Sequence, residues 1–377
     1  MIVNLEEVSE IVNDKKSSDF LDDNSYVTTE NMLTNREGVK FPAKNLPKNL
    51  EKVNSYKKGD ILISNIRPYF KKIWLADRDG TSSGDVLIFR SISNLLLQEY
   101  LYLVLQTDVF FNYMTATSTG TKMPRGNKEA IKRFKFHLPN IEQQKSVLKK
   151  ILLLERKVQL NNQINANLVE LCQHLLKTDL KLGSYSLKKI SDLDITVSDH
   201  VSNGSFKALK ENVSYFDKPN YALFLRNIDL KKKTNSNQLK YIDKPSYDYL
   251  KKSHLFGGEV VISNVADVGT IHRVPKVDTP MVLGNNQIFI SSGRSYLTDY
   301  LYVYFKSLQG QSLIKSITSG SAQQKFNKTD FRNLEIPLID EHRIKKYITP
   351  LLMYQDVLNR ESTLLNNIKT TLLKTLI

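Results

Sequence analysis

The clearest alternation of apolar and polar residues lies in the middle of the chain, between Asn140 and Leu182. This stretch contains neither Gly nor Pro, and its apolar residues recur at the a and d spacing of a coiled-coil seam: Val147, Ile151, Leu154, Val158, Leu168, Cys172 and Leu175. Asn161 and Asn165 fall on the same seam, where a buried Asn would penalise slipped helix pairings. About 38 helical residues would span roughly 55 Å. The alternative is an ordinary long core helix.

The residues on the two sides of this helix resemble each other in a fixed order, which indicates a domain duplication. The repeated pairs are Gly59–Asn65 with Gly258–Asn264, Glu99–Leu105 with Asp299–Phe305, Ser118–Gly120 with Thr318–Gly320, Asn127-Lys128 with Asn327-Lys328, and Phe134–Leu138 with Leu334–Leu338. A second helical stretch, Arg343 to Ile377, closes the chain, and Pro350 should start or kink it. Its seam is less regular than the first.

Each long helix exposes an apolar stripe, so we expect the two helices to pair antiparallel. The domain boundaries then fall at residues 1–139, 140–182, 183–338 and 339–377, with a globular domain before each helix. Within the first domain, the pattern predicts a short helix from Leu5 to Val12 and one helix from Gln98 to Met114. It predicts strands at Ile61–Ile63, Lys71–Ala76 and Val86–Phe89.

The net charge of the chain narrows the range of binding partners that we expect. The 377 residues carry a formal net charge of +15, which favours a polyanion, nucleic acid first and an acidic membrane surface second. A merely soluble basic protein is the alternative. The single cysteine, Cys172, rules out a disulfide framework or a Cys-based zinc site. No apolar run approaches the length of a membrane span and no signal segment is visible, so we expect a cytoplasmic protein with no membrane partner.

Catalytic motifs are not found. Asn65-Ile-Arg-Pro-Tyr69 differs from the Asn-Pro-Pro-Tyr motif of DNA amino-methyltransferases, and Gly120–Gly126 fails the spacing of a P-loop. The six histidines show no metal-ligand spacing. Asp60 and Glu259 each follow a glycine at a strand start, which is typical of turns. We therefore expect no catalytic residue, cofactor or metal in this chain.

Three phrases together resemble a known family. These are the Gly59–Asn65 strand, the loop Thr117-Ser-Thr-Gly-Thr121 followed by Asn127-Lys-Glu129, and Leu138-Pro-Asn-Ile-Glu-Gln-Gln-Lys145 opening a long helix. Their order, repeated around the intervening helix, is similar to the specificity subunits of type I restriction-modification enzymes. The resemblance implies an α+β fold, with two duplicated α/β target-recognition domains joined and spaced by two long antiparallel coiled-coil helices. In the second half, Ile339-Asp-Glu-His-Arg343 departs from the last phrase.

The resemblance also implies a function. The chain would be a non-catalytic DNA-recognition subunit, each half reading one half of a bipartite asymmetric site on double-stranded DNA. The helices would dock two methyltransferase subunits, and an endonuclease/translocase subunit would join them. S-adenosylmethionine, ATP and magnesium would belong to those partners. The alternatives are a recognition subunit of a related type II system, a stand-alone DNA-modifying enzyme, and a coiled-coil scaffold or transcription regulator.

Candidate DNA contacts lie in loops where basic and amide side chains accompany small residues. Lys and Arg hold phosphates, and side chains at base edges read sequence. In the first domain the candidates are Arg67, Tyr69, Lys71, Lys72, Lys122, Arg125 and Lys128; in the second they are Arg226, Asn227, Gln323, Gln324, Lys325 and Lys328. Arg125 and Lys325 are at equivalent positions. The run Lys231–Lys233 is either a further contact or a solvated face.

Overall fold

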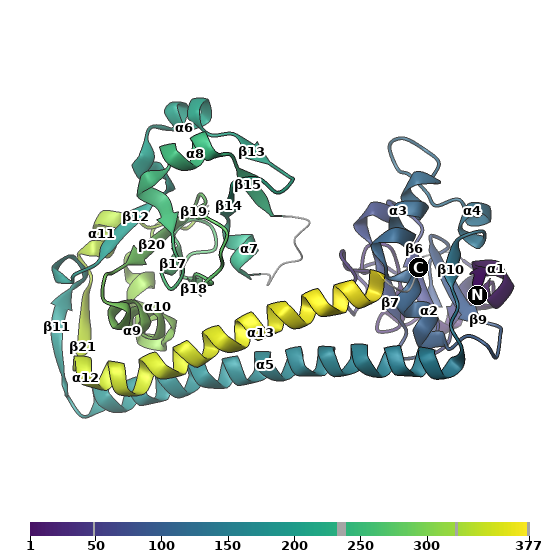
Figure 1. Ribbon diagram of the computed structural model, residues 1–377, viewed down its shortest axis with the longest axis horizontal. Coiled ribbons are helices and arrows are strands. Elements are labelled where there is room, and N and C mark those ends of the chain that lie inside the picture. The colour runs from purple at the N-terminus through teal and green to yellow at the C-terminus, as the bar shows by residue number, and fades with distance from the viewer. Residues whose placement is uncertain (48–49, 232–238, 321–322, 375–377) are drawn as a thin grey trace. The chain divides into compact units, whose positions relative to one another are not determined.

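The computed structural model describes residues 1–47, 50–231, 239–320 and 323–374 (Figure 1). The chain forms two compact units: Met1–Val158 with Leu364–Ile377, and Gln159–Thr363. Each long helix contributes one part to each unit. Among the described residues, no helix is long and apolar enough to cross a membrane.

The first unit contains two four-stranded sheets and a two-stranded ribbon. One sheet has the order β2–β9–β6–β7 (Ser9–Ile11, Val86–Ser91, Ile61–Ser64, Ile73–Leu75), and the other β3–β5–β8–β4 (Lys15–Ser17, Lys52–Tyr56, Gly80–Ser82, Tyr26–Val27). Strand β1 (Ile2–Asn4) pairs antiparallel with β10 (Lys135–His137). The helices are α1 (Leu5–Val8), η1 (Ser18–Phe20), η2 (Pro68–Phe70), α2 (Gln98–Leu105), α3 (Asp108–Ala116) and α4 (Lys128–Lys132). A buried cluster that includes Ile61, Phe89, Leu101 and Phe110 joins the first sheet to α2 and α3.

The second unit repeats this plan. Its sheets are β12–β20–β17–β18 (Thr196–Asp199, Gln287–Ser291, Val260–Ser263, Ile271–Arg273) and β13–β15–β14–β19–β16 (Tyr215–Phe216, Lys240–Ile242, Ala222–Leu225, Met281–Leu283, His254–Leu255), and the ribbon is β11–β21 (Tyr185–Lys189, Glu335–Ile339). The helices are η3 (Ile190–Asp192), η4 (His200–Asn203), α6 (Phe206–Asn212), α7 (Asn227–Lys231), α8 (Lys244–Tyr249), η6 (Lys251–Ser253), α9 (Ser295–Lys306), α10 (Leu308–Ser316) and α11 (Lys328–Arg332).

The duplication extends to the details of pairing and capping. Strand β6 lies between β7 and β9, as β17 lies between β18 and β20, with antiparallel pairing throughout. The Thr107 hydroxyl caps α3 and the Ser307 hydroxyl caps α10. The Asn127 and Asn327 side chains cap α4 and α11. Because a cap satisfies backbone N–H groups at a helix start, these residues fix where the repeated helices begin.

Helices α5 (Ile141–Lys181) and α13 (Thr349–Lys374) run alongside each other in opposite directions (Figure 1). The Asn161 side chain donates to Glu361 Oε2 at 2.7 Å and to Ser362 Oγ at 3.2 Å. The Asn165 side chain donates to Asn359 Oδ1 at 2.9 Å. A later residue of α5 thus contacts an earlier residue of α13, which confirms the antiparallel pairing.

The predicted seam is largely correct. Ile151 and Cys172 are buried, and Asn161 is fully enclosed. Near the end of α5, Leu176 is buried in place of the predicted Leu175. The second helical run starts at Glu341: α12 (Glu341–Arg343), the π-turn η7 (Ile344–Ile348) and α13 follow one another without a break. Pro350 lies where η7 passes into α13, which begins at Thr349. The last residues of the predicted second helix, 375–377, lie outside the described residues.

Three predicted elements were wrong. Helix α1 ends at Val8, and β2 takes the remainder of the expected helix because its residues pair with β9. The single helix expected from Gln98 to Met114 is two helices, since the Thr107 hydroxyl accepts a hydrogen bond from Phe110 N–H and starts α3. The strand expected from Lys71 begins at Ile73, because Lys71 has left-handed backbone angles (φ 52°).

Candidate nucleic-acid interface

In the first unit, two loops far apart in sequence are joined by backbone hydrogen bonds. The Arg125 N–H donates to Thr119 O at 2.9 Å, and the Thr119 N–H donates to Arg125 O at 2.9 Å. The Arg67 N–H donates to Pro124 O at 2.8 Å. The tip formed by residues 120–124 therefore lies beside the turn that carries Arg67 and Tyr69. The two candidate patches of this unit form one surface.

The second unit builds the same scaffold from different side chains. Ser319 and Lys325 exchange two backbone hydrogen bonds, and the Ala266 N–H donates to Gln324 O at 3.0 Å. Arg67 and Ala266 occupy the same place in the two units, and both have left-handed backbone angles (φ 51° and 64°). This geometry costs free energy for any residue but Gly, so its recurrence indicates that the surroundings hold it.

Several first-unit candidates are open to solvent. Arg67 and Lys122 are exposed, and so is Tyr69. Arg125 is also exposed, although its guanidinium lies 3.1 Å from the Asp85 carboxylate. An exposed ion pair of this kind contributes little to stability, so Arg125 can exchange Asp85 for a phosphate at small cost.

Lys71 and Lys72 are already engaged within the first unit. Lys71 Nζ lies 2.5 Å from the Asp108 carboxylate, which Arg36 also contacts. Lys72 Nζ donates to the Thr29 carbonyl, and burial lowers the pKa of its ammonium group. A phosphate would have to displace these partners. The assignment of both lysines to DNA contact stays a prediction, with weaker geometric support than that of Arg67 and Lys122.

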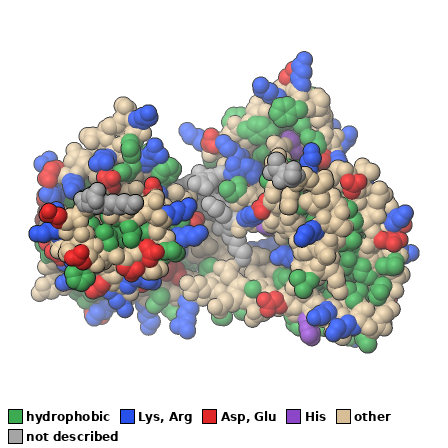
Figure 2. All heavy atoms as spheres, turned by 180° about the vertical axis from the view of Figure 1, so that it is seen from behind, with side chains coloured by type: hydrophobic (Ala, Val, Ile, Leu, Met, Phe, Trp, Pro, Cys, Tyr) green, Lys and Arg blue, Asp and Glu red, His purple; other side chains and the backbone are tan. Residues whose placement is uncertain are grey.

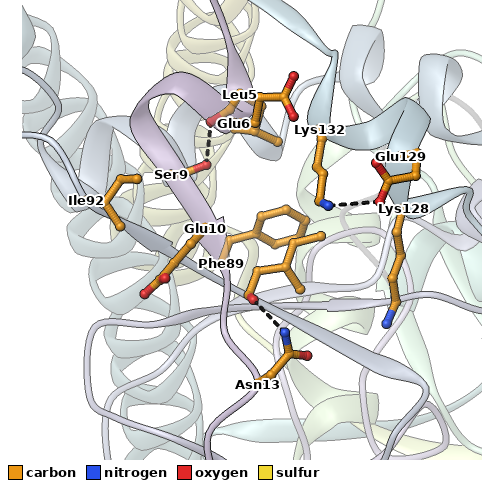
Figure 3. A pocket seen from close by; sticks show the side chains of 11 residues that line it. Leu5, Glu6, Ser9, Glu10, Asn13, Phe89, Ile92, Lys128, Glu129 and Lys132 are labelled. Atoms are coloured by element: carbon orange, nitrogen blue, oxygen red, sulfur yellow. Dashed lines mark hydrogen bonds and ion pairs between the residues drawn. The ribbon is translucent and has the colours of Figure 1, made fainter.

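Lys128 lies at the start of α4 and lines a hollow of about 380 Å³, together with Glu129 and Lys132 (Figure 3). Lys132 Nζ and Glu129 Oε1 are 2.8 Å apart. Glu6 and Glu10 also line the hollow, which therefore carries charges of both signs. Of these residues, Lys128 is the one proposed for DNA contact from the sequence.

The second-unit candidates Arg226 and Asn227 are held by acidic neighbours. Two nitrogens of Arg226 each lie 2.8 Å from the Asp229 carboxylate, whose hydrogen bonds raise the pKa of the guanidinium. The Asn227 amide donates to Asp267 Oδ2 at 3.1 Å, and its oxygen lies 3.2 Å from His272 Nε2. Bidentate pairing fixes the plane of the Arg226 group.

The remaining candidate residues of the second unit fall into two groups, those exposed to solvent and one that is already ion-paired. Gln323, Gln324 and Lys325 are exposed, whereas Lys328 is paired with Asp199 at 2.8 Å and also donates to the Ser202 hydroxyl. Of the run Lys231–Lys233, only Lys231 is described, and it pairs with Asp267; Lys232 and Lys233 lie outside the described residues.

Sequence reasoning missed the carboxylates that accompany these cations. Asp85, Asp108, Asp229 and Asp267 each contact a candidate side chain. Only the pairing of Asp229 with Arg226 could have been predicted locally, because the two residues are three positions apart at a helix start. The other carboxylates are far in sequence from the side chains that they contact. Figure 2 shows Lys and Arg side chains mixed with Asp and Glu on the visible surface of each unit. The described residues contain no group of His, Cys, Asp and Glu that could hold a metal ion.

Comparison with known proteins finds similarity to one family over the first part of the chain. Residues 1–170 match the family described as type I restriction modification DNA specificity domain. The first 170 residues of the chain are therefore similar to this family. A relative in this family is the type I restriction enzyme HindI specificity subunit of Haemophilus influenzae, which is 31% identical over 141 residues. That match spans 36% of this chain and only 30% of the relative.

Solved structures similar to this chain include an S subunit and an HsdS subunit. The S subunit of a type I restriction-modification system from M. genitalium has a TM-score of 0.49 and 13% identity, over 100% of this chain and 95% of that one. The HsdS subunit from Thermoanaerobacter tengcongensis has a TM-score of 0.43 and 18% identity, over 99% and 95%. The structure confirms the fold class expected from the sequence, and the expected family matches residues 1–170. The domain boundaries and DNA contacts stay predictions.

Proposed function

We propose that this chain is the non-catalytic DNA-specificity subunit of a type I restriction-modification complex. In this proposal each unit reads one half of a bipartite, asymmetric site on double-stranded DNA. The observation that carries the proposal is the duplicated loop scaffold with Arg125 and Lys325 at the same backbone position. Beside them, the exposed Arg67 of one unit is replaced by Ala266 in the other. A shared scaffold with different side chains suits two readers of different half-sites.

The chemistry of the loops supports this assignment. Phosphate contacts come from Lys and Arg, and sequence is read by side chains that reach base edges. Exposed Arg67, Lys122 and Arg125 in the first unit, and Gln323 and Lys325 in the second, offer both kinds of contact. The net charge of +15 adds long-range attraction to DNA.

The long helices are proposed to set the length of the unread centre of the site. Helix α5 has 41 residues, and a rise of about 1.5 Å per residue gives a rod of roughly 60 Å. That length covers more than one turn of duplex, at about 34–36 Å per turn. Buried Asn161 and Asn165 hold the register of the helix pair, so the length available to separate the readers is defined.

The outer faces of the helices are proposed to dock two methyltransferase subunits. Helix α13 exposes Met353, Val357, Leu364 and Ile368 at helical spacing, and α5 exposes Leu153, Leu160 and Leu171. Repeated exposed apolar side chains mark contact surfaces for other proteins. S-adenosylmethionine would bind to these partners, and ATP and magnesium to an endonuclease/translocase subunit.

A recognition subunit of a related type II system would have the same geometry and differs only in its partners. Co-purification separates these proposals, because type I assembly requires separate methyltransferase subunits, in two copies, bound to this chain. A stand-alone DNA-modifying enzyme would instead methylate DNA as the purified single chain.

The test is to map methylated motifs in cells that express this chain with its methyltransferase subunit, and in cells that lack the chain. The proposal requires a bipartite motif that disappears without the chain. In a second strain, Leu152–Glu155 of α5 and the facing Lys369–Leu372 of α13 are deleted together. Removing one turn from both helices, about 6 Å, should shorten the spacer by about two base pairs.

The facing segments are chosen because Lys369 Nζ and Glu155 Oε1 are 2.5 Å apart. The matched control exchanges these two charges, E155K with K369E, and keeps the helix length. Its spacer should equal that of the parent chain. A motif without a spacer would contradict the two-reader proposal, and an unchanged spacer in the deletion strain would contradict the role of the helices as a ruler.

A further inference from the structure

The candidate DNA-facing loops of the first unit carry large apolar side chains that are open to solvent. Met123 is 50% exposed, Tyr69 48% and Phe70 36%. Met123 lies between Lys122 and Arg125 in the loop tip, and Tyr69 and Phe70 follow Arg67. Proteins that bend DNA combine cations for the phosphates with apolar wedges that enter a base step. The first unit has both components on one surface.

The backbone that presents a wedge must be held in place, because a loose loop would move aside on DNA contact. The Thr119–Arg125 hydrogen bonds close the loop that carries Met123, and the Arg67–Pro124 bond ties it to the neighbouring turn. That turn is itself bounded by two left-handed residues, Arg67 and Lys71. The Tyr69 and Phe70 rings contact each other, with centroids 4.7 Å apart.

The second unit has the same scaffold without the apolar side chains. Gln323 takes the place of Met123 in the loop closed by Ser319 and Lys325. The place of Tyr69 is taken by Val268, which is partly buried and packs against the core of its own unit. The bonds that close the loop and tie it to the neighbouring turn recur in the second unit, although the turn itself has different internal hydrogen bonds.

We infer that the first unit inserts Met123, which lies in the loop tied to the turn of Tyr69 and Phe70, into a base step of its half-site and unstacks it. The second unit reads its half-site without unstacking. This inference rests on the proposed function and adds an energetic selection to it. Pyrimidine–purine steps are the easiest to unstack, so the first half-site should contain one at the wedge position even where no side chain contacts the base edges.

The experiment uses the complex of the full chain with its methyltransferase subunits and the mapped target duplex. A fluorescent adenine analogue that brightens when unstacked replaces each adenine of both half-sites in turn, on either strand. Brightening is expected at one step in the half-site of the first unit. The Met123→Gln variant, which installs the residue of the second unit, should reduce that brightening at least fivefold.

Two further variants keep the result interpretable. Gln323→Met should create new brightening in the other half-site. Lys122→Ala should weaken binding at raised salt while leaving the brightening of the bound complex unchanged. Extrusion of a base by a methyltransferase subunit would persist in Met123→Gln, so only the part lost in that variant is assigned to the wedge.

Equal brightening in the parent and Met123→Gln complexes, or none in either, would overturn the inference while leaving sequence-specific binding intact. A complex that fails to select a bipartite site at all would overturn the proposed function, and the wedge with it. The binding measurement made on the same samples distinguishes these two failures.

Discussion

Replacing Gln144 with Leu should weaken the attachment of the first unit to helix α5. Gln144 is fully buried in the first turns of that helix. Its side-chain N–H groups donate to Leu95 O at 2.7 Å and to Pro139 O at 2.9 Å. Its carbonyl accepts from the Leu97 N–H at 2.9 Å. One side chain therefore fixes the loop before α2 and the segment that leads into α5.

The expected loss follows from these three bonds. Leu has a volume similar to that of Gln, so the substitution removes the polar contacts without leaving a large cavity. The Leu97 N–H and two carbonyl oxygens lose their partner. An unsatisfied buried group costs about 1–3 kcal/mol, and Leu95 is exposed, which allows water to replace part of the loss. We expect a decrease of about 2–3 kcal/mol in the free energy of unfolding of the first unit.

The assay is urea unfolding followed by tryptophan fluorescence. Trp74 is the only tryptophan of the chain and lies in the first unit, where its ring contacts Phe41 and Tyr56. The signal therefore reports this unit alone. A loss of 2–3 kcal/mol should raise the unfolding equilibrium constant about 30- to 140-fold.

The matched control is Gln143→Leu, one residue earlier. Gln143 is exposed and shares a capping box with Asn140, whose side chain accepts from the Gln143 N–H at 2.9 Å. Only the weaker bond from the Asn140 N–H is lost, so the change should stay below about 1 kcal/mol. Equal destabilisation by the two variants, or none by Gln144→Leu, would refute the assignment of Gln144 as the fixing residue.

Other predictions test the helix seam, the second unit and the loops. Asn161→Leu should cost about 1–3 kcal/mol by leaving polar partners on α13 facing an apolar side chain; Ser362→Ala in the same chain should recover part of this in a double-mutant cycle. Burial lowers the pKa of His272 to about 4, so stability present above the unfolded pKa near 6.5 should be lost as the pH falls toward 4, by up to about 3 kcal/mol. His272→Gln should flatten that profile, measured by urea titration at each pH. Lys122→Ala and Arg125→Ala should each reduce the log–log salt dependence of DNA binding by about one.

Features repeated along the chain could be predicted from the sequence. The helix seam follows from a regular spacing, and burial of Asn161 followed from its position on that seam. The break between α2 and α3 was missed because the helix was predicted from the apolar residues on both sides of the polar segment Gln106-Thr107-Asp108. The role of Thr107 depends on its side chain accepting from Phe110 N–H, which periodicity does not register. The apolar residues do lie in helices as predicted, but the cap at Thr107 divides them between α2 and α3.

The candidate site was predictable only in part, because charge in a sequence does not show whether it is already paired. Lys71 and Lys122 look alike in the sequence, yet Lys71 is paired with Asp108 and Lys122 is exposed. The pairing partner lies 37 residues away. Similarly, the repeat indicated that Lys128 and Lys328 are equivalent, whereas Lys328 is bound by Asp199. Long-range ion pairs decide which cations remain available to DNA.

The two long helical runs are capped in the same way at their starts, but they are held to their globular units by different interactions. Asp340 accepts from the Arg343 N–H at 3.2 Å, so it caps its helix as Asn140 caps α5, although the surrounding phrase differs. The position equivalent to Gln144 is Ile344, which is fully buried in the apolar core of the second unit. One half therefore fixes its helix with three hydrogen bonds and the other with packing. Exchanging only the helix starts would bury an unpartnered amide in one half and leave backbone groups unsatisfied in the other, so functional chimeras must carry each globular unit together with its own helix start.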